Sequence, residues 1–225
     1  MSDPPRITSI TPTARNPRRA TVRVGRKVVA TLPTKQIDEL GLSVDQPWDE
    51  ALAARLQQAA QVDKAMRKAM NRLNRRAMSR RDLDRKLHDL EFDQATRQHV
   101  LDRLTELKYL DDEALGRALI RETQRARPAG PRLLRQKLFQ KGLDRKLIDQ
   151  LIAETRDTAD PEAEAVTLAR QRLRRMSRLD PPARQRRLFG LLARRGFEPE
   201  TINAAMETLR DEIVDGTGEA FDASE

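Results

Sequence analysis

Apolar and polar residues alternate through residues 6–32, and beyond residue 49 apolar residues recur every three or four positions. The alternating apolar positions are Val22, Val24, Val28, Ala30 and Leu32. The pair Gly25-Arg26 separates them into two runs, which is typical of a β-hairpin with a short turn. Pro33 then opens a short helix through Leu40, and Gly41 closes it. We therefore predict a β-hairpin with a short helix over residues 1–48, in which the hairpin packs against that helix or against Trp48, the only tryptophan.

After residue 49 an apolar triplet with spacings of four and five residues occurs three times. The copies are Leu83, Leu87 and Phe92; Leu134, Leu138 and Leu143; and Leu188, Leu192 and Phe197. They are offset by 51 residues and then by 54 (134 − 83 and 188 − 134). Each copy lies in a segment with room for three helices, so the pattern predicts tandem three-helix repeats. The expected fold is mainly α, an elongated and curved array of repeats with a small amino-terminal β segment.

The turns and composition shifts divide this array. The predicted divisions are a connecting helix at 49–62, three repeats at 63–110, 111–158 and 159–212, and an acidic disordered tail at 213–225.

Charge strengthens the case for a binding protein. The chain has 225 residues, of which 35% are charged and 3% aromatic, with 44 basic and 35 acidic side chains. Residues 211–225 hold six acids and no base, so the rest of the chain carries a balance of +15 (44 − 29). There is no cysteine, which excludes disulfides and thiolate chemistry. With no long apolar run either, we expect a cytosolic protein without a membrane segment.

Basic residues cluster in stretches that read as helical. Residues 64–88 hold ten bases and two acids, and residues 168–195 hold ten bases and one acid. Such clusters favour contact with phosphates or with an acidic protein surface, and the alternative is a solvated helix surface balanced by neighbouring acids. The predicted contact residues are Arg75, Arg76, Arg80, Arg81, Arg85, Lys86, Arg132, Arg135, Lys137, Lys141, Arg174, Arg175, Arg186, Arg187, Arg194 and Arg195.

The sequence offers little for catalysis. His88 and His99 have no metal-ligand spacing around them and are expected at the surface. The pair Asp111-Asp112 stands at a helix start, where carboxylates cap backbone N–H groups. We therefore expect no enzyme activity, no metal and no cofactor.

Three strings resemble one known family. YLDDEALGRALIRE begins at Tyr109, GPRLLRQKLFQKGL begins at Gly130, and ARRGFEPETI begins at Ala193. Together with the tandem copies they resemble the RecX family of bacterial recombinase modulators over residues 64–210. The resemblance implies a cytosolic, non-enzymatic protein that binds RecA and RecA–DNA filaments, lies in the filament's groove and restrains recombinase ATPase and strand exchange. With the basic clusters, we expect a monomer that contacts single-stranded DNA, with duplex DNA as a further candidate.

Two features leave alternatives open. The first repeat has Glu91 where the others have Gly142 and Gly196, so its turn is expected to pack less tightly. The acidic tail could shield the basic surface or be an inert solubilising end.

An alternative function is also open. Instead of a recombinase regulator, the chain could be a stand-alone helical-repeat protein that binds DNA without a recombinase.

Overall fold

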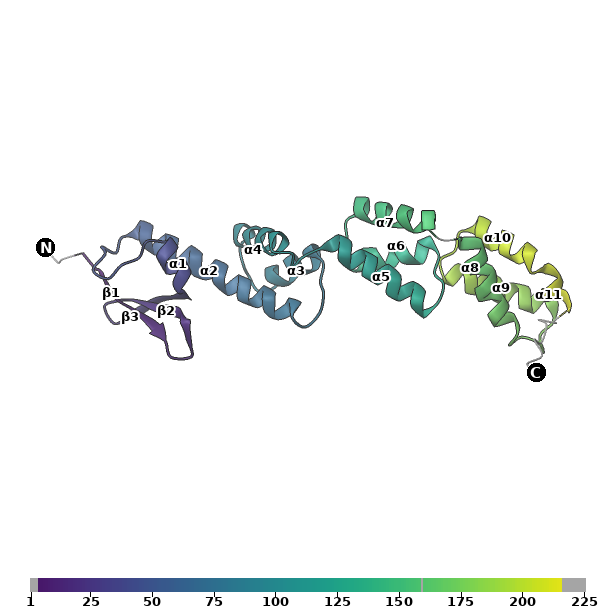
Figure 1. Cartoon of the computed structure of the whole chain (residues 1–225), viewed down its shortest axis with the longest axis horizontal. Coiled ribbons are helices and arrows are strands. Elements are labelled where there is room, and N and C mark those ends of the chain that lie inside the picture. Colours follow the sequence, from purple (N-terminus) through teal and green to yellow (C-terminus); the bar gives the residue numbers. More distant parts are fainter. Residues whose placement is uncertain (1–3, 159, 216–225) are drawn as a thin grey trace. The chain divides into compact units, whose positions relative to one another are not determined.

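The computed structural model describes residues 4–158 and 160–215 (Figure 1). The chain forms two compact units, Met1–Ala77 with Asp82–Leu110, and Met78–Arg81 with Asp111–Glu225. We call them the N-terminal unit and the C-terminal unit. The prediction of a mainly helical protein with tandem three-helix repeats and a small N-terminal β segment is confirmed.

The β segment has one strand more than the predicted hairpin. Strands β1 (Ile7–Thr13), β2 (Asn16–Val24) and β3 (Lys27–Pro33) form an antiparallel sheet in the order β1-β2-β3. The predicted pairing across Gly25-Arg26 is present between β2 and β3. Strand β1 was not predicted, because Ile7 and Ile10 are three residues apart and a strand pattern requires apolar residues at every second position. A register shift after Ile7 breaks the alternation there.

One apolar position of the hairpin faces the other way from its prediction. The register passes from Val22 opposite Ala30 to Arg23 opposite Val28, so Val29 is an extra residue in β3. A bulge of this kind reverses the alternation of side chains. Val28 is consequently 45% exposed, while Val29 packs partly against the core.

A short and a long helix complete this segment. Helix α1 (Thr34–Glu39) ends before Gly41, which has the left-handed φ of 65° that glycine accepts at such a terminus. Helix α2 (Glu50–Leu73) runs without a break across residues 62 and 63, where a connecting helix and a first repeat were predicted to meet. Asp63 lies on α2 and accepts hydrogen bonds from both terminal nitrogens of Arg19 in β2, at 2.9 and 2.7 Å. This bond raises the pKa of Arg19 and fixes the sheet on the helix.

The first repeat combines α2 with α3 (Arg80–His88) and α4 (Gln94–Glu106). Leu83, Leu87 and Phe92 are buried as the triplet predicts. Asp93 caps α4 by accepting a hydrogen bond from the backbone N–H of Thr96 at 2.9 Å. The Thr96 hydroxyl, itself buried, accepts a hydrogen bond from Gln58 of α2 at 3.0 Å.

The second and third repeats each have a core of their own. The second contains α5 (Asp112–Ala126), α6 (Pro131–Gln140) and α7 (Arg145–Thr158). The third contains α8 (Pro161–Leu173), α9 (Pro181–Arg194) and α10 (Pro199–Thr208). Both remaining triplets are buried, one in each core. Within the described ranges, no helix combines the length and apolarity that crossing a membrane requires.

The start of the predicted disordered tail is ordered. Helix α11 (Arg210–Asp215) carries the chain past residue 212, and Ile213 is buried in the third core. The cause is Arg184 of α9, whose guanidinium donates to the carbonyl oxygens of Ile213 at 2.8 Å and Val214 at 3.4 Å. Residues 216–225, the rest of the predicted tail, lie outside the described residues.

The second and third repeats, both in the C-terminal unit, meet at a backbone joint. The backbone N–H of Gly130, just before α6, donates to Arg195 O at 2.9 Å, and Arg132 N–H donates to Gly196 O at 3.0 Å. The start of α6 therefore docks on the turn that follows α9. Within the same unit, the Ser79 hydroxyl donates to Lys141 O at 2.6 Å.

Candidate functional site

The predicted contact residues lie on the middle helices and on the loops that flank them, and the structure sorts them into two classes. Nine are exposed and form no ion pair with another described residue. These are Arg75, Arg81, Arg132, Lys141, Arg174, Arg175, Arg186, Arg187 and Arg194. We call them the free cations. Their charge is available to an anionic partner without first breaking a contact within the described chain.

In the first repeat, three predicted residues are already paired. Arg76 and Arg85 both contact the carboxylate of Asp82, the former at 3.4 Å. Lys86 contacts Asp89 at 3.1 Å. These pairs are partly solvated, so each contributes little to stability, but each lowers the net positive charge of α3.

In the second repeat, Arg135 and Lys137 are also engaged. Arg135 lies 3.5 Å from Asp149 and 3.8 Å from Glu198, and Lys137 donates to the Thr123 hydroxyl at 3.3 Å. They are therefore weaker candidates for partner contact than the free cations.

Arg80 and Arg195 both form hydrogen bonds within the C-terminal unit. The backbone N–H of Arg80 donates to the carboxylate of Asp112 at 2.8 Å. The guanidinium of Arg195 donates to Pro128 O at 2.8 Å and also to Arg127 O. Burial, followed by the nearby charge of Arg127, lowers the pKa of Arg195. Arg195 therefore holds the joint between the second and third repeats, and its contact with a partner stays a prediction.

Helical geometry decides which free cations share a side of a helix. At about 100° per residue, Arg186, Arg187 and Arg194 fall within roughly 100° of arc on α9, away from the core leucines. On α6, by contrast, Arg135 and Lys137 are separated by about 160°. Helix α9 thus has one basic side, whereas the bases of α6 are divided between two.

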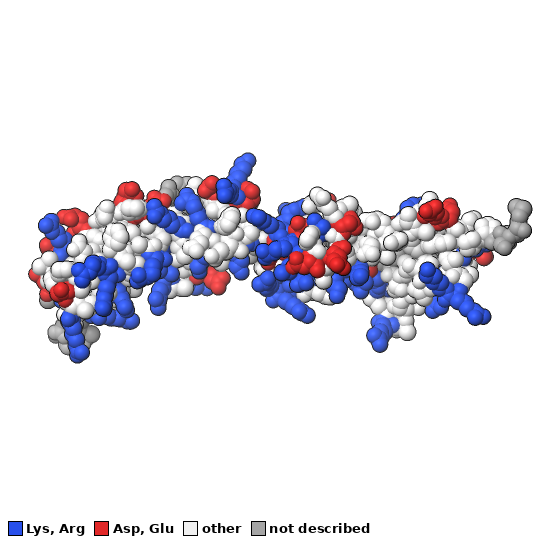
Figure 2. Space-filling view, turned by 180° about the vertical axis from the view of Figure 1, so that it is seen from behind, with Lys and Arg blue, Asp and Glu red and all other residues white. Residues whose placement is uncertain are grey.

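Basic and acidic side chains are interspersed on the surface. Figure 2 shows Lys and Arg side chains in several separate groups on the face that it presents, with Asp and Glu between some of them. In the first and second repeats, Asp82 and Asp149 pair with predicted contact residues.

Two phenylalanines of the middle helices are exposed. Phe139 of α6 is 52% exposed and Phe189 of α9 is 45% exposed. Each lies between the middle and closing helix of its repeat. Their exposure agrees with the sequence pattern, because neither residue occupies a position of the repeated apolar triplet.

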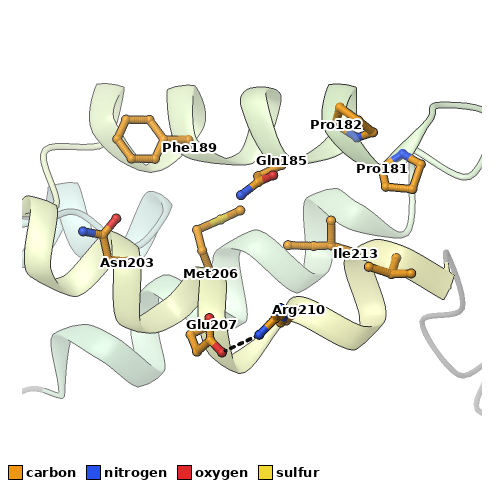
Figure 3. A pocket seen from close by; sticks show the side chains of 10 residues that line it. Pro181, Pro182, Gln185, Phe189, Asn203, Met206, Glu207, Arg210 and Ile213 are labelled. Atoms are coloured by element: carbon orange, nitrogen blue, oxygen red, sulfur yellow. Dashed lines mark hydrogen bonds and ion pairs between the residues drawn. The ribbon is translucent and has the colours of Figure 1, made fainter.

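The groove at Phe189 is mainly uncharged and has a volume of about 580 Å³. Met206 of α10 extends toward Gln185 of α9 there, and Glu207 is paired with Arg210 at 3.3 Å (Figure 3). The groove at Phe139, between α6 and α7, has a volume of about 410 Å³, and its lining includes Arg135 and Arg145. The two grooves therefore differ in the cations beside their aromatic ring.

The predicted capping role of the acidic pair is confirmed. Asp111 accepts from Ala114 N–H at 2.8 Å at the start of α5, and Asp112 accepts from Arg80 N–H. His88 and His99 are exposed as predicted. No group of three or more potential metal ligands occurs among residues 4–158 and 160–215.

Comparisons with known proteins match the repeats one by one. Family models described as the first, second and third three-helix domains of RecX match residues 65–104, 111–152 and 160–206. The regulatory protein RecX of Corynebacterium efficiens is 35% identical over 66% of this chain and 73% of its own length. That of Listeria monocytogenes serotype 4a is 25% identical over 92% of this chain and 77% of its own length.

Solved structures agree on the fold. A crystal structure of regulatory protein RecX covers 92% of this chain and 100% of its own, with a TM-score of 0.75 and 21% identity. RecX from Lactobacillus salivarius covers 67% of this chain and 97% of its own, with a TM-score of 0.60. The three repeats, their buried triplets and these matches show that the chain belongs to the RecX family.

Proposed function

We propose that this protein is a non-enzymatic regulator of homologous recombination and DNA repair that binds RecA and RecA–DNA filaments and inhibits recombinase ATPase and strand exchange. The observation that carries the proposal is the set of nine free cations in a chain of the RecX family. Exposed arginines form bidentate contacts with phosphates and carboxylates, the two anionic groups that a protein–DNA filament presents.

The separation of free and paired cations gives the proposal a physical basis. When about six phosphates of a DNA partner contact the free cations, the DNA releases its condensed counterions. The affinity for DNA should therefore fall on the order of a thousandfold between 50 and 200 mM salt. Paired residues such as Arg85 contribute less, because a partner must compete with Asp82 for them. We therefore place the main contact on α9, on the α8–α9 loop and at both ends of α6.

The test is a titration of recombinase ATPase activity on single-stranded DNA, with competitor duplex present. Inhibition at amounts well below the recombinase is the expected result, because one regulator bound to a filament affects many subunits. Inhibition only when the protein suffices to coat the DNA would contradict the proposal. That outcome would favour a stand-alone DNA-binding protein.

A further inference from the structure

We infer that the groove between α6 and α7 is a binding site for a nucleobase of single-stranded nucleic acid, with Phe139 as the stacking surface. The inference deepens the proposed function, since it assigns the DNA contact to named residues. It begins with the exposure of Phe139, which leaves about half of an aromatic side chain in water on a middle helix.

The surroundings of Phe139 are cationic. Arg132, Arg135 and Phe139 fall within about 60° of arc on α6, so they share one side of the helix. Arg145, at the start of α7, lines the same groove. Arg132 and Arg145 are exposed and form no ion pair with another described residue.

The acidic side chain that lines the groove is paired with an arginine. Asp149, the acid that lines it, lies 3.5 Å from Arg135, and Arg135 is also held by Glu198 at 3.8 Å. This contact neutralises Asp149 and leaves Arg132 and Arg145 for phosphates. Residues 131–149, which include Asp149, hold six bases and two acids, so the local balance is positive.

An aromatic ring between cations fits a nucleotide better than an aliphatic side chain of a protein partner. Base stacking uses the ring face, and the phosphates on either side of the base require positive charge. The buried Ile148 adds an apolar side chain to the lining of the groove.

Phe189 provides a matched control. It has the same residue type, lies on the middle helix of the next repeat and has comparable exposure. Its groove is lined by Pro181, Pro182, Met206, Ile213 and Val214, and the arginine in that lining is paired with Glu207. Arg186, three residues before Phe189 on α9, is a free cation but does not line this groove. The two grooves thus differ in their lining, because Arg145 lines the groove at Phe139 without an acid partner among the described residues, whereas Arg210 in the groove at Phe189 is paired.

The experiment compares a 15-residue oligothymidylate with an abasic oligonucleotide of the same length, in the absence of recombinase and at fixed salt. Phe139→Leu should weaken binding to the oligothymidylate on the order of tenfold and leave binding to the abasic strand unchanged. Phe139→Trp should retain affinity. In a Trp48→Phe background its fluorescence should be quenched by the oligothymidylate. Phe189→Leu should change either affinity less than about twofold.

Three results would overturn the inference. They are equal weakening of both strands by Phe139→Leu, no effect on either strand, or wild-type binding that does not distinguish the two strands. If Phe139→Leu leaves both strands unchanged but abolishes inhibition of the recombinase, the groove holds a protein side chain instead. The proposed function then survives, because the ATPase titration tests it separately.

Discussion

Single residues show where the repeats diverge. The turn after the middle helix has a left-handed residue in every repeat: Glu91 with φ of 61°, Gly142 with 82° and Gly196 with 78°. A side chain in this conformation costs about 1–2 kcal/mol, whereas glycine adopts it freely. The first repeat is therefore strained at a position where the others are relaxed, while the looser packing expected of this turn stays a prediction.

Replacing Glu91 with glycine should relieve this strain. Because glycine also gains conformational freedom in the unfolded chain, we expect Glu91→Gly to raise the free energy of unfolding of the N-terminal unit by about 0.5–1 kcal/mol. Gly142→Ala should lower that of the C-terminal unit by about 1 kcal/mol. Urea unfolding followed by circular dichroism measures both, and a less stable Glu91→Gly protein would refute the argument.

Asp112 couples stability to pH. Burial raises its pKa, and the hydrogen bond from Arg80 N–H opposes this effect only in part. A raised pKa in the folded state means that the contribution of Asp112 to stability is fully present below its unfolded pKa. This contribution is lost as pH rises through the folded value.

Asp112→Asn should therefore be more stable than the wild type at pH 7, since the amide oxygen still accepts from Arg80 and carries no charge. The advantage should shrink as the pH falls toward about 4. Urea unfolding at both pH values measures the difference. A gap that does not change with pH, or a less stable variant at pH 7, would count against this account of Asp112.

The burial of many single residues could be predicted from the sequence. All three apolar triplets are buried because helical periodicity alone specifies a core-facing stripe. The hydrogen bonds of Arg195 could not be predicted, because its partners are backbone oxygens of Arg127 and Pro128, more than sixty residues away. Val28 was misplaced because a bulge leaves no mark in an alternating pattern.

At the scale of elements, the joint between the second and third repeats requires a residue without a side chain at position 130. A Cβ at Gly130 would collide with the backbone of Gly196 and Phe197, whereas one at Gly190, inside α9, would meet only the flexible end of Arg194 at 3.2 Å. Both glycines belong to the C-terminal unit, so they form a matched pair.

Gly130→Ala should lower the free energy of unfolding of the C-terminal unit by about 2 kcal/mol, because the backbones at the joint must separate. Gly190→Ala should raise it by about 0.5–1 kcal/mol, since alanine favours the helix. Thermal and urea unfolding give both values. Equal effects of the two substitutions would show that the joint is not tightly packed.

Arg184 secures the last helix. It is 7% exposed, and besides α11 it donates to Met176 O at 3.3 Å and Ser177 O at 3.1 Å. Arg184→Met should cost about 2–4 kcal/mol, because buried carbonyl groups lose a charged donor. Arg186→Met, two residues along at the surface, should cost less than about 0.5 kcal/mol. Comparable losses in urea unfolding would contradict the assigned role.

Element boundaries were predicted less well than element types. The predicted boundary between residues 62 and 63 falls inside helix α2, because no helix-breaking residue stands in that stretch. Helix α11 was missed because its sequence is acidic, and its order depends on Arg184 in a different helix. Repeat counting locates helices, but contacts between distant segments decide where they end.

At the scale of the whole molecule, the central question is which charges a partner can use. The sequence predicted sixteen contact residues, and the structure divides them by their partners rather than by their position in the repeat. The expectation of a curved, elongated array of repeats stays a prediction.

The most direct measurement compares two variants with six cations replaced by glutamine. One removes free cations, namely Arg132, Lys141, Arg174, Arg175, Arg186 and Arg187. The other removes cations that are paired with acids, namely Lys35, Arg76, Arg85, Arg103, Arg117 and Arg210. Both lower the net charge by six, and the readout is the concentration that half-inhibits recombinase ATPase on single-stranded DNA. The first variant should raise that concentration on the order of a hundredfold and the second less than about threefold. Equal shifts would contradict the account, because bulk charge rather than the free cations would then determine inhibition.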